Sequence, residues 1–360
     1  MAKIQKVAEL AGVSTATVSR ALAGKPSVSA ATRLRVEAAA KELGYVVSAT
    51  ASSLASGKTR NIGVVTPFLN SWFFTTVLKG AQRALADAGY DLTLYHLDST
   101  PGFDLPQGSN PRRRQLFEDF LKRKRVDAIL AISLELNASE LEQLRGVGKP
   151  VVGLGGPLPG VPTLSVDDRE IARLATDHLL ALGHKSIAHI GGNPDFDIDF
   201  HLPENRRVGY EAALTAAGIE LSPLMVRSAD FTIPGGYNAT LQLLGDPRVS
   251  PTAIFAASDE MAIGAILAAR DLGKTVPGDL SVIGIDGHDL SDFFGLTTIN
   301  QFPERQGQRA VQRLLARIAD KDDDGSGDAG NEQLEYELLV RKSTAAPPRS
   351  SSPNTRARKA

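Results

Sequence analysis

The sequence predicts a small all-α head, a short connecting segment and a larger α/β core that contains two parallel sheets. Three observations predict this organisation. Apolar residues recur at helical spacing near the N-terminus, short buried-strand runs alternate with helical segments over the rest of the chain, and positive charge is concentrated at the start. With 360 residues, 42% of them hydrophobic, the chain is long enough for two or three domains with real cores.

Charge separates the head from the core. Residues 1–60 contain nine Lys and Arg against three Glu, a net charge of +6, whereas the other 300 residues contain 31 basic and 38 acidic side chains, a net charge of −7. A basic module in front of a mildly acidic body is typical of a nucleic-acid-binding head on a regulatory domain. Charge alone fits an ordinary solvated surface equally well.

Composition excludes several classes of protein. The absence of cysteine excludes disulfide scaffolds, thiol catalysis and cysteine-ligated zinc. The first residues are polar and lack the apolar core of a secretion signal, and polar residues interrupt the uncharged stretch 61–78, so that no membrane span is expected. These features predict a cytoplasmic protein with no membrane partner.

Three helices are expected in the head. An apolar pattern at i, i+3, i+4 and i+7 predicts the first helix, which Gly12 ends; Ser14 can cap a short second helix that runs to about Ala23, and Ser29 a third that ends at Gly44. A helix, a tight glycine turn and a short polar helix make the helix-turn-helix plan, although a generic three-helix bundle also fits. The apolar side of the third helix is expected to comprise Leu34, Val36, Ala39, Ala40 and Leu43.

The residues from Val7 to Leu22, VAELAGVSTATVSRAL, closely resemble the headpiece of the lactose-repressor and galactose-repressor family of bacterial transcription regulators. The resemblance continues through Leu43-Gly44-Tyr45 and returns in the body to about Thr344. It implies a helix-turn-helix head at residues 1–46, joined by a hinge helix to an α/β core of two periplasmic-binding-protein-like subdomains. The implied partner is double-stranded DNA.

The resemblance also assigns roles in the head. Thr15 and Ala16 would determine which operator sequence is bound, and Arg20 would contact a base. The implied phosphate-binding residues are Ser14, Thr17 and Ser19. The chemistry agrees, because hydroxyls at a helix N-terminus suit phosphate oxygens and an Arg fork can take guanine O6 and N7.

The connecting segment, residues 47–60, allows two interpretations. Its Ser, Ala and Gly content is that of a flexible linker. The resemblance instead implies a hinge helix whose Leu54 wedges into the minor groove. The chain departs from the usual family pattern here, with Val47 where proline is common and Ser48 where asparagine is frequent.

Strand and helix units alternate through the body, which predicts two parallel sheets with a ligand site at the carboxyl ends of their strands. The resemblance implies two subdomains joined by three crossings, placed near Pro162, near Phe302 and within 320–331. The assigned ranges are 61–162 plus 303–322 for the first subdomain, 163–302 plus 332–344 for the second, and a disordered tail at 345–360. The acidic run after Asp320 lacks EF-hand spacing and favours a solvated loop over a calcium site.

Six residues are expected to bind the effector. By resemblance, Asp286 accepts hydrogen bonds from ligand hydroxyls and Arg206 donates to the ligand. Ser258 can contact ligand while its neighbour Asp259 either does the same or caps the next helix. The remaining candidates are the aromatic residues Phe231, Trp72 and Phe74, whose flat rings suit a sugar face, with core packing equally open for Phe74 and for Phe73.

Catalysis has no support in the sequence. Its histidines show no close metal-binding pair, no phosphate-binding loop opens a helix, and Asp167-Asp168 fits helix capping better than a carboxylate pair. We therefore predict a transcription repressor, not an enzyme, without cofactor or metal. It would act as a homodimer on an inverted-repeat operator, and a sugar bound in the cleft would change its affinity for DNA. A sugar-binding transport or sensor protein and an enzyme of sugar metabolism are the alternatives.

Overall fold

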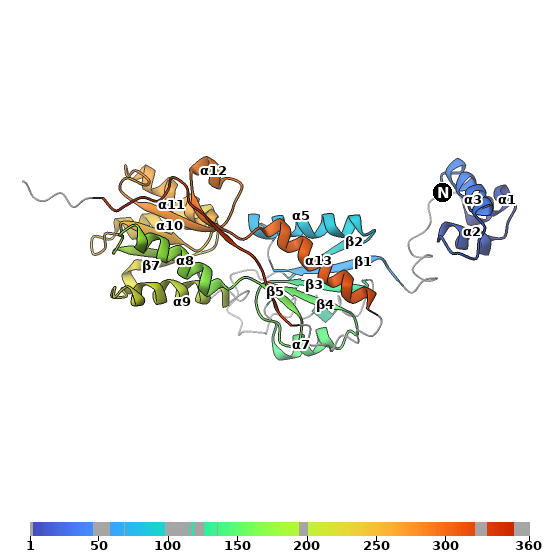
Figure 1. Ribbon diagram of the computed structural model, residues 1–360, viewed down its shortest axis with the longest axis horizontal. Helices are drawn as coiled ribbons and strands as arrows, with labels where there is room; N and C mark the ends of the chain where they lie inside the picture. Colours follow the sequence, from blue (N-terminus) through green and yellow to red (C-terminus); the bar gives the residue numbers. More distant parts are fainter. Residues whose placement is uncertain are drawn as a thin grey trace, which may run out of the picture. The chain divides into compact units, whose positions relative to one another are not determined.

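The computed structural model describes residues 3–45, 58–67, 69–97, 115, 117–118, 126–134, 136–193, 201–320 and 330–348 (Figure 1). The chain forms two compact units, one containing the head and one containing the body. The predicted hinge helix with Leu54 and residues 349–360 of the predicted tail lie outside the described residues. Within the described part of the chain, no helix is long and apolar enough to cross a membrane.

The head consists of three helices, α1 (Ile4–Ala11), α2 (Thr15–Leu22) and α3 (Ala30–Glu42), with the predicted caps. Ser14 accepts a hydrogen bond from the Thr17 N–H, and Ser29 caps α3 in the same way. Val7, Val18 and Val36 are completely buried between the helices. One prediction is wrong: Leu34 is 67% exposed, because it lies on the face of α3 away from Val36.

The described residues of the body form two sheets, as predicted, and each of them has six strands. The first has the strand order β11-β5-β4-β3-β1-β2. Strand β1 pairs with β3, β3 with β4, β4 with β5 and β5 with β11, and all four pairs are parallel. With the helices that cover it, this sheet forms the first subdomain. Its elements are β1 (Asn61–Thr66), α5 (Trp72–Asp87), β2 (Asp91–His96), β3 (Ala128–Ile132), α7 (Ala138–Arg145), β4 (Val151–Leu154), β5 (Thr163–Ser165), α13 (Pro303–Ala319) and β11 (Glu332–Gln333).

The second sheet has the order β12-β10-β9-β8-β6-β7 and is parallel except for β12. It forms the second subdomain, in which α8 and α9 cover one face and α10 and α11 the other (Figure 1). Its elements are α8 (Asp168–Ala181), β6 (Ile187–Gly192), α9 (His201–Ala216), the 3₁₀ turn η1 (Pro223–Met225), β7 (Val226–Ala229), α10 (Ile233–Gly245), β8 (Ala253–Ala256), α11 (Asp259–Asp271), β9 (Ser281–Asp286), α12 (Ser291–Phe294), β10 (Thr297–Asn300) and β12 (Glu337–Leu339).

Glycines allow the helices of the first subdomain to pack closely on one another. A Cβ atom on Gly80 of α5 would lie 2.0 Å from the Glu304 carbonyl oxygen, and one on Gly307 of α13 would lie 2.0 Å from that of Val77. Only glycine permits this approach of the two backbones. It packs the middle of α5, around Val77 and Gly80, against the first two turns of α13.

Two of the predicted subdomain boundaries are wrong. Strand β5 pairs with β4, so the first crossing follows Ser165 instead of Pro162. Strand β11 pairs with β5 and β12 with β10, so the third crossing lies between Gln333 and Glu337, later than the predicted 320–331. The predicted tail also begins too early, because Ala345 exchanges hydrogen bonds with the Ser281 side chain.

Candidate functional site

The second helix of the head presents a polar face to solvent. Ser14, Thr15, Ala16, Ser19 and Arg20 are exposed, as the sequence predicts for residues that contact DNA. Thr17 is half-buried, and its hydroxyl lies 2.9 Å from the Ser14 hydroxyl. The positions at i, i+1, i+4 and i+5 from Thr15 share one side of a helix, so Arg20 projects from the same face as Thr15 and Ala16.

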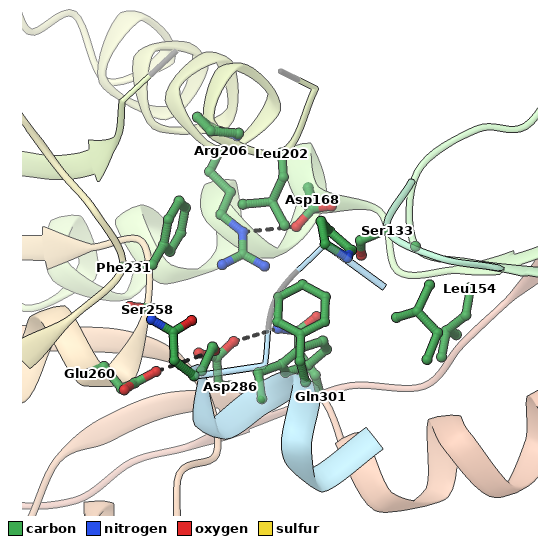
Figure 2. Close-up of a pocket in the computed structure, with 18 of the residues that line it drawn as sticks. Ser133, Leu154, Asp168, Leu202, Arg206, Phe231, Ser258, Glu260, Asp286 and Gln301 are labelled. Carbon is green, nitrogen blue, oxygen red and sulfur yellow. Dashed lines mark hydrogen bonds and ion pairs between the residues drawn. The ribbon is translucent and has the colours of Figure 1, made fainter. Parts of the chain in front are cut away.

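The body has a cavity of about 460 Å³ where the carboxyl ends of both sheets meet (Figure 2). Residues at or just after the carboxyl ends of strands line it from each subdomain. The first subdomain contributes Ser133 after β3 and Leu154 at the end of β4, and the second contributes Phe231 after β7 and Asp286 at the end of β9. A cleft at the carboxyl ends of parallel strands is the usual ligand site of such sheets.

Unusual backbone conformations occur at these strand ends. Ser133, Phe231 and Asp286 have positive φ angles of 45°, 59° and 131°. Each such residue costs about 1–3 kcal/mol unless its surroundings compensate, and residues of this kind concentrate at ligand sites. In Figure 2 the Phe231 ring lies beside the Arg206 side chain.

A buried ion pair lies at the centre of the cavity wall. The Arg206 Nε donates to Asp168 Oδ1 at 2.8 Å, and Arg206 Nη1 donates to the Ala257 carbonyl oxygen. Asp286 accepts a hydrogen bond of 2.9 Å from the Gln301 side-chain amide. The structure therefore brings the two predicted ligand-binding residues, Arg206 and Asp286, into one cavity, and holds each by a neighbour.

Burial makes ionisation of the cleft carboxyls costly. It raises the pKa of Asp168, against the opposing charge and hydrogen bond of Arg206. It raises the pKa of Asp286 well above its ordinary value, again against the Arg206 charge. Burial also raises the pKa of Glu260, which hydrogen bonds from Trp72 and Ser71 partly offset.

The aromatic lining differs from the prediction at one position. Phe74 and Phe231 line the cavity as predicted, and Phe73 lines it as well. The prediction for Trp72 is corrected, because this residue is not among those that line the cavity. Its ring stacks on His288, with ring centroids 4.4 Å apart, and its Nε1 donates to Asp289 at 3.2 Å.

The contacts of Trp72 form part of a joint between the two subdomains. Glu260 on α11 accepts hydrogen bonds of 3.3 Å from the Trp72 N–H and from the Ser71 hydroxyl. We call the set Ser71, Trp72, Glu260, His288 and Asp289 the cleft joint. It connects the start of α5 in the first subdomain to α11 and the segment after β9 in the second.

Ser258 and Asp259 divide their roles differently from the prediction. Ser258 lines the cavity and also caps α11, since its hydroxyl accepts from the Met261 N–H. Asp259 is not the cap. It is fully buried and accepts hydrogen bonds from the His288 N–H at 2.8 Å and the Ser291 hydroxyl at 2.9 Å.

Sequence reasoning missed several polar residues of the cavity, among them Asp168, Gln301 and Glu260. Asp168 was assigned to helix capping, a role that its neighbour Asp167 fills with hydrogen bonds from Arg169 and Glu170. Gln301 follows β10, and recognition of that strand would have drawn attention to it. Glu260 gives no local signal, because its position one residue into α11 is also typical of a first-turn acid.

The comparisons with known proteins agree with the two-part architecture. The model of bacterial regulatory proteins of the lacI family matches residues 3–48, and that of the periplasmic binding protein-like domain matches residues 176–344. The chain is 34% identical to the HTH-type transcriptional repressor CytR of Escherichia coli strain K12 over 351 residues, which cover 96% of this chain and 97% of that protein.

Two solved structures extend the similarity to the fold. One is the lac repressor dimer bound to operator and the anti-inducer ONPF, with a TM-score of 0.81 and 29% identity, covering 96% of this chain and 99% of that one. The other is the complex of the transcriptional regulator CelR with cellobiose, with a TM-score of 0.67 and 30% identity, covering 95% and 100%.

Proposed function

Because this chain belongs to the lacI family of bacterial regulatory proteins and is a DNA-binding transcription regulator, we propose that it is a repressor whose operator affinity is controlled by a sugar bound in the cleft. The observation that carries the proposal is the presence, in one chain, of an exposed polar face on α2 and a cavity lined from both subdomains. A ligand that binds one arrangement of the subdomains more tightly shifts the protein toward that arrangement.

The cleft chemistry supports a sugar as effector. The aromatic rings of Phe73, Phe74 and Phe231 offer flat apolar surfaces, and Asp286 and Arg206 offer charge-assisted hydrogen bonds to hydroxyl groups. The structurally similar CelR is described in complex with cellobiose. The relative CytR is a transcriptional repressor, and we propose that this protein likewise is not an enzyme and acts in the cytoplasm.

The head supports recognition of a paired site. Helix α2 has eight residues and can cover only one half-site in the major groove. The structurally similar lac repressor binds its operator as a dimer. We propose that this chain is also a homodimer and reads an inverted repeat, with Thr15, Ala16 and Arg20 toward the bases and Ser14, Thr17 and Ser19 toward the phosphates.

Selection from random duplex DNA tests the proposal. The full chain is expected to enrich duplexes with two inverted half-sites, and Arg20→Ala to enrich sequences with one less specified base pair per half-site. Failure to enrich any sequence over several rounds would contradict the assignment. Enrichment of an isolated half-site would contradict the dimer.

A further inference from the structure

The cavity carries an excess of acidic side chains. Among the described residues that line it are four carboxyl groups, Asp168, Asp230, Glu260 and Asp286, one guanidinium, Arg206, and the imidazole of His96. The buried Asp259 lies directly before Glu260 in the chain and adds a fifth carboxyl behind the wall. A ligand that enters this space leaves water and meets four carboxyl groups, which accept hydrogen bonds when they are ionised, and a single guanidinium.

Arg206, the residue that would attract an anion, is already paired. Its Nε binds Asp168 at 2.8 Å and its Nη1 binds the Ala257 carbonyl oxygen. Its positive charge also lowers the cost of ionising Asp286, on the other side of the guanidinium. Without any ligand, the single positive charge of Arg206 therefore already interacts favourably with two carboxyl groups, those of Asp168 and Asp286 (Figure 2).

A negative charge on the ligand would meet an unfavourable field in the cavity. Burial already raises the pKa of Asp168, Glu260 and Asp286, which means that their ionised forms are poorly solvated there. A phosphate or carboxylate beside them would repel each of these groups that is ionised, or force it to take up a proton, in a medium that screens charge less than water does. Hydroxyl and ammonium groups, in contrast, donate hydrogen bonds to carboxylates.

We propose that the effector is a polyhydroxy compound that bears no anionic group, and that the cleft discriminates against the phosphorylated and carboxylated forms of the same compound. This inference rests on the proposed function of the cleft. It also implies a place for the effector in a reaction sequence. The effector would be the substrate of a kinase or an oxidase, and the anionic product of that enzyme would not bind.

The test is a ligand panel with matched members. Thermal unfolding of the full chain is followed with pentoses, hexoses and disaccharides, each beside its phosphate ester, its aldonic acid and, where one exists, its amino derivative. The largest stabilisation is expected from a free or amino member, with the phosphate partner binding at least about tenfold more weakly. A phosphate or aldonate that binds as tightly as its neutral partner would overturn the proposal, and so would a panel in which no neutral or amino member raises the melting temperature.

A charge variant separates this proposal from a merely steric exclusion of phosphate. Glu260→Gln keeps an oxygen that accepts from Ser71 and Trp72 and removes one negative charge from the cavity. Discrimination between a free sugar and its phosphate should narrow by about threefold to tenfold in this variant. The matched variant Glu220→Gln, at an exposed position in the segment that follows α9, should leave the ratio unchanged. An unchanged ratio in Glu260→Gln would overturn the charge argument.

Operator binding without ligand keeps the two proposals distinguishable. If the panel shows the expected discrimination but the full chain selects no DNA sequence, the proposed function fails and the charge preference of the cleft holds. If the chain selects an inverted repeat and the best ligand is a phosphate ester, the repressor assignment holds and the inference about the effector fails.

Discussion

Arg20 and Arg206 show how the surroundings of a single residue determine what its charge can do. Arg20 is exposed on α2, where its guanidinium group is accessible to a base pair. Arg206 is 3% exposed and is paired with Asp168 and the Ala257 carbonyl, so it orients the cavity wall as much as it binds ligand. Substitutions at the two positions should therefore affect different functions.

For Arg20→Ala we expect a loss of specific operator binding of about 1–3 kcal/mol, with relaxed preference at one base pair of each half-site. Ser19→Ala is the matched control. Ser19 is exposed and, unlike Ser14, caps no helix, so its loss should weaken binding to all sequences more evenly. Fluorescence anisotropy with operator and random duplexes measures both effects, and equal losses on the two duplexes for Arg20→Ala would rule out base reading.

His189 gives the second subdomain a defined response to acid. The residue is fully buried, its ring stacks on Phe255 and Tyr210, and its Nδ1 lies 3.1 Å from the Phe255 carbonyl oxygen. Burial lowers the pKa of His189 to about 4. At pH values below 6.5, the ordinary pKa of histidine, the His189 side chain is protonated in the unfolded chain but stays neutral in the folded chain down to about pH 4. The free energy of unfolding therefore falls as the pH drops from about 6.5 to 4.

Replacement of this histidine by phenylalanine should flatten the pH response. Between pH 7 and pH 5 the wild type should lose about 2 kcal/mol more unfolding free energy than His189→Phe, whose ring cannot titrate. Urea unfolding at the two pH values measures the difference. Because both proteins share every other titrating group, parallel losses would show that His189 does not carry this dependence.

At the scale of elements, the cleft joint connects α5 to α11. Trp72 is the only tryptophan of the chain, and it lies in this joint, outside the ligand cavity. Its fluorescence therefore reports the contact between the subdomains without a label. If the effector binds the closed cleft, contacts of the joint contribute to effector affinity through the equilibrium between open and closed forms.

His288→Ala removes the stacking partner of Trp72. We expect a red shift of the tryptophan emission and an effector affinity reduced about threefold to tenfold, since stacked pairs contribute about 0.5–1.5 kcal/mol. Asp292→Ala is the control, at an exposed position four residues further along the chain. Among the described charged groups Asp292 pairs only with Arg341, so its replacement should change neither the tryptophan emission nor the effector affinity. Unchanged emission and affinity in His288→Ala would show that the joint does not stabilise the closed form.

The sequence predicted the elements well where the signal is local. Ser14 and Ser29 cap their helices and Gly12 ends α1 because these roles depend on neighbouring residues only. The subdomain boundaries failed because β5 and β11 are three and two residues long and exist only through pairing with distant strands. Within the site, the strand end and the family resemblance identified Asp286, and the resemblance identified Phe231. The Arg206–Asp168 pair, 38 residues apart, depends on the packing of α8 on α9, which no local pattern reveals.

At the scale of the whole molecule, the second subdomain has an exposed apolar surface suited to a second copy of the chain. Phe293 is 86% exposed, and Leu290 and Val340 are 39% and 61% exposed. The ion pair between Asp292 and Arg341 holds α12 next to the chain after β12, so these side chains belong to one region. Large apolar side chains exposed together are typical of protein interfaces.

Phe293→Ser should therefore convert the dimer into a monomer. Sedimentation at micromolar concentration measures the mass, and Leu221→Ser, at an exposed apolar residue outside this surface, is the control that should stay dimeric. The monomeric variant should bind one half-site and lose most of its affinity for the inverted repeat, because the two heads are no longer linked. A Phe293→Ser protein that remains dimeric would place the interface elsewhere.

The central claim is that ligand in the cleft controls the affinity of the head for DNA. Its most direct test is an anisotropy titration of the full chain on the inverted repeat that it selects, with and without a saturating concentration of the panel ligand that stabilises it most. Saturation is verified by the Trp72 emission. A change in operator affinity of about fivefold or more is expected in the wild type, and none in Arg206→Ala, whose cavity lacks the ligand-binding guanidinium. Equal operator affinity with and without bound ligand in the wild type would contradict the claim.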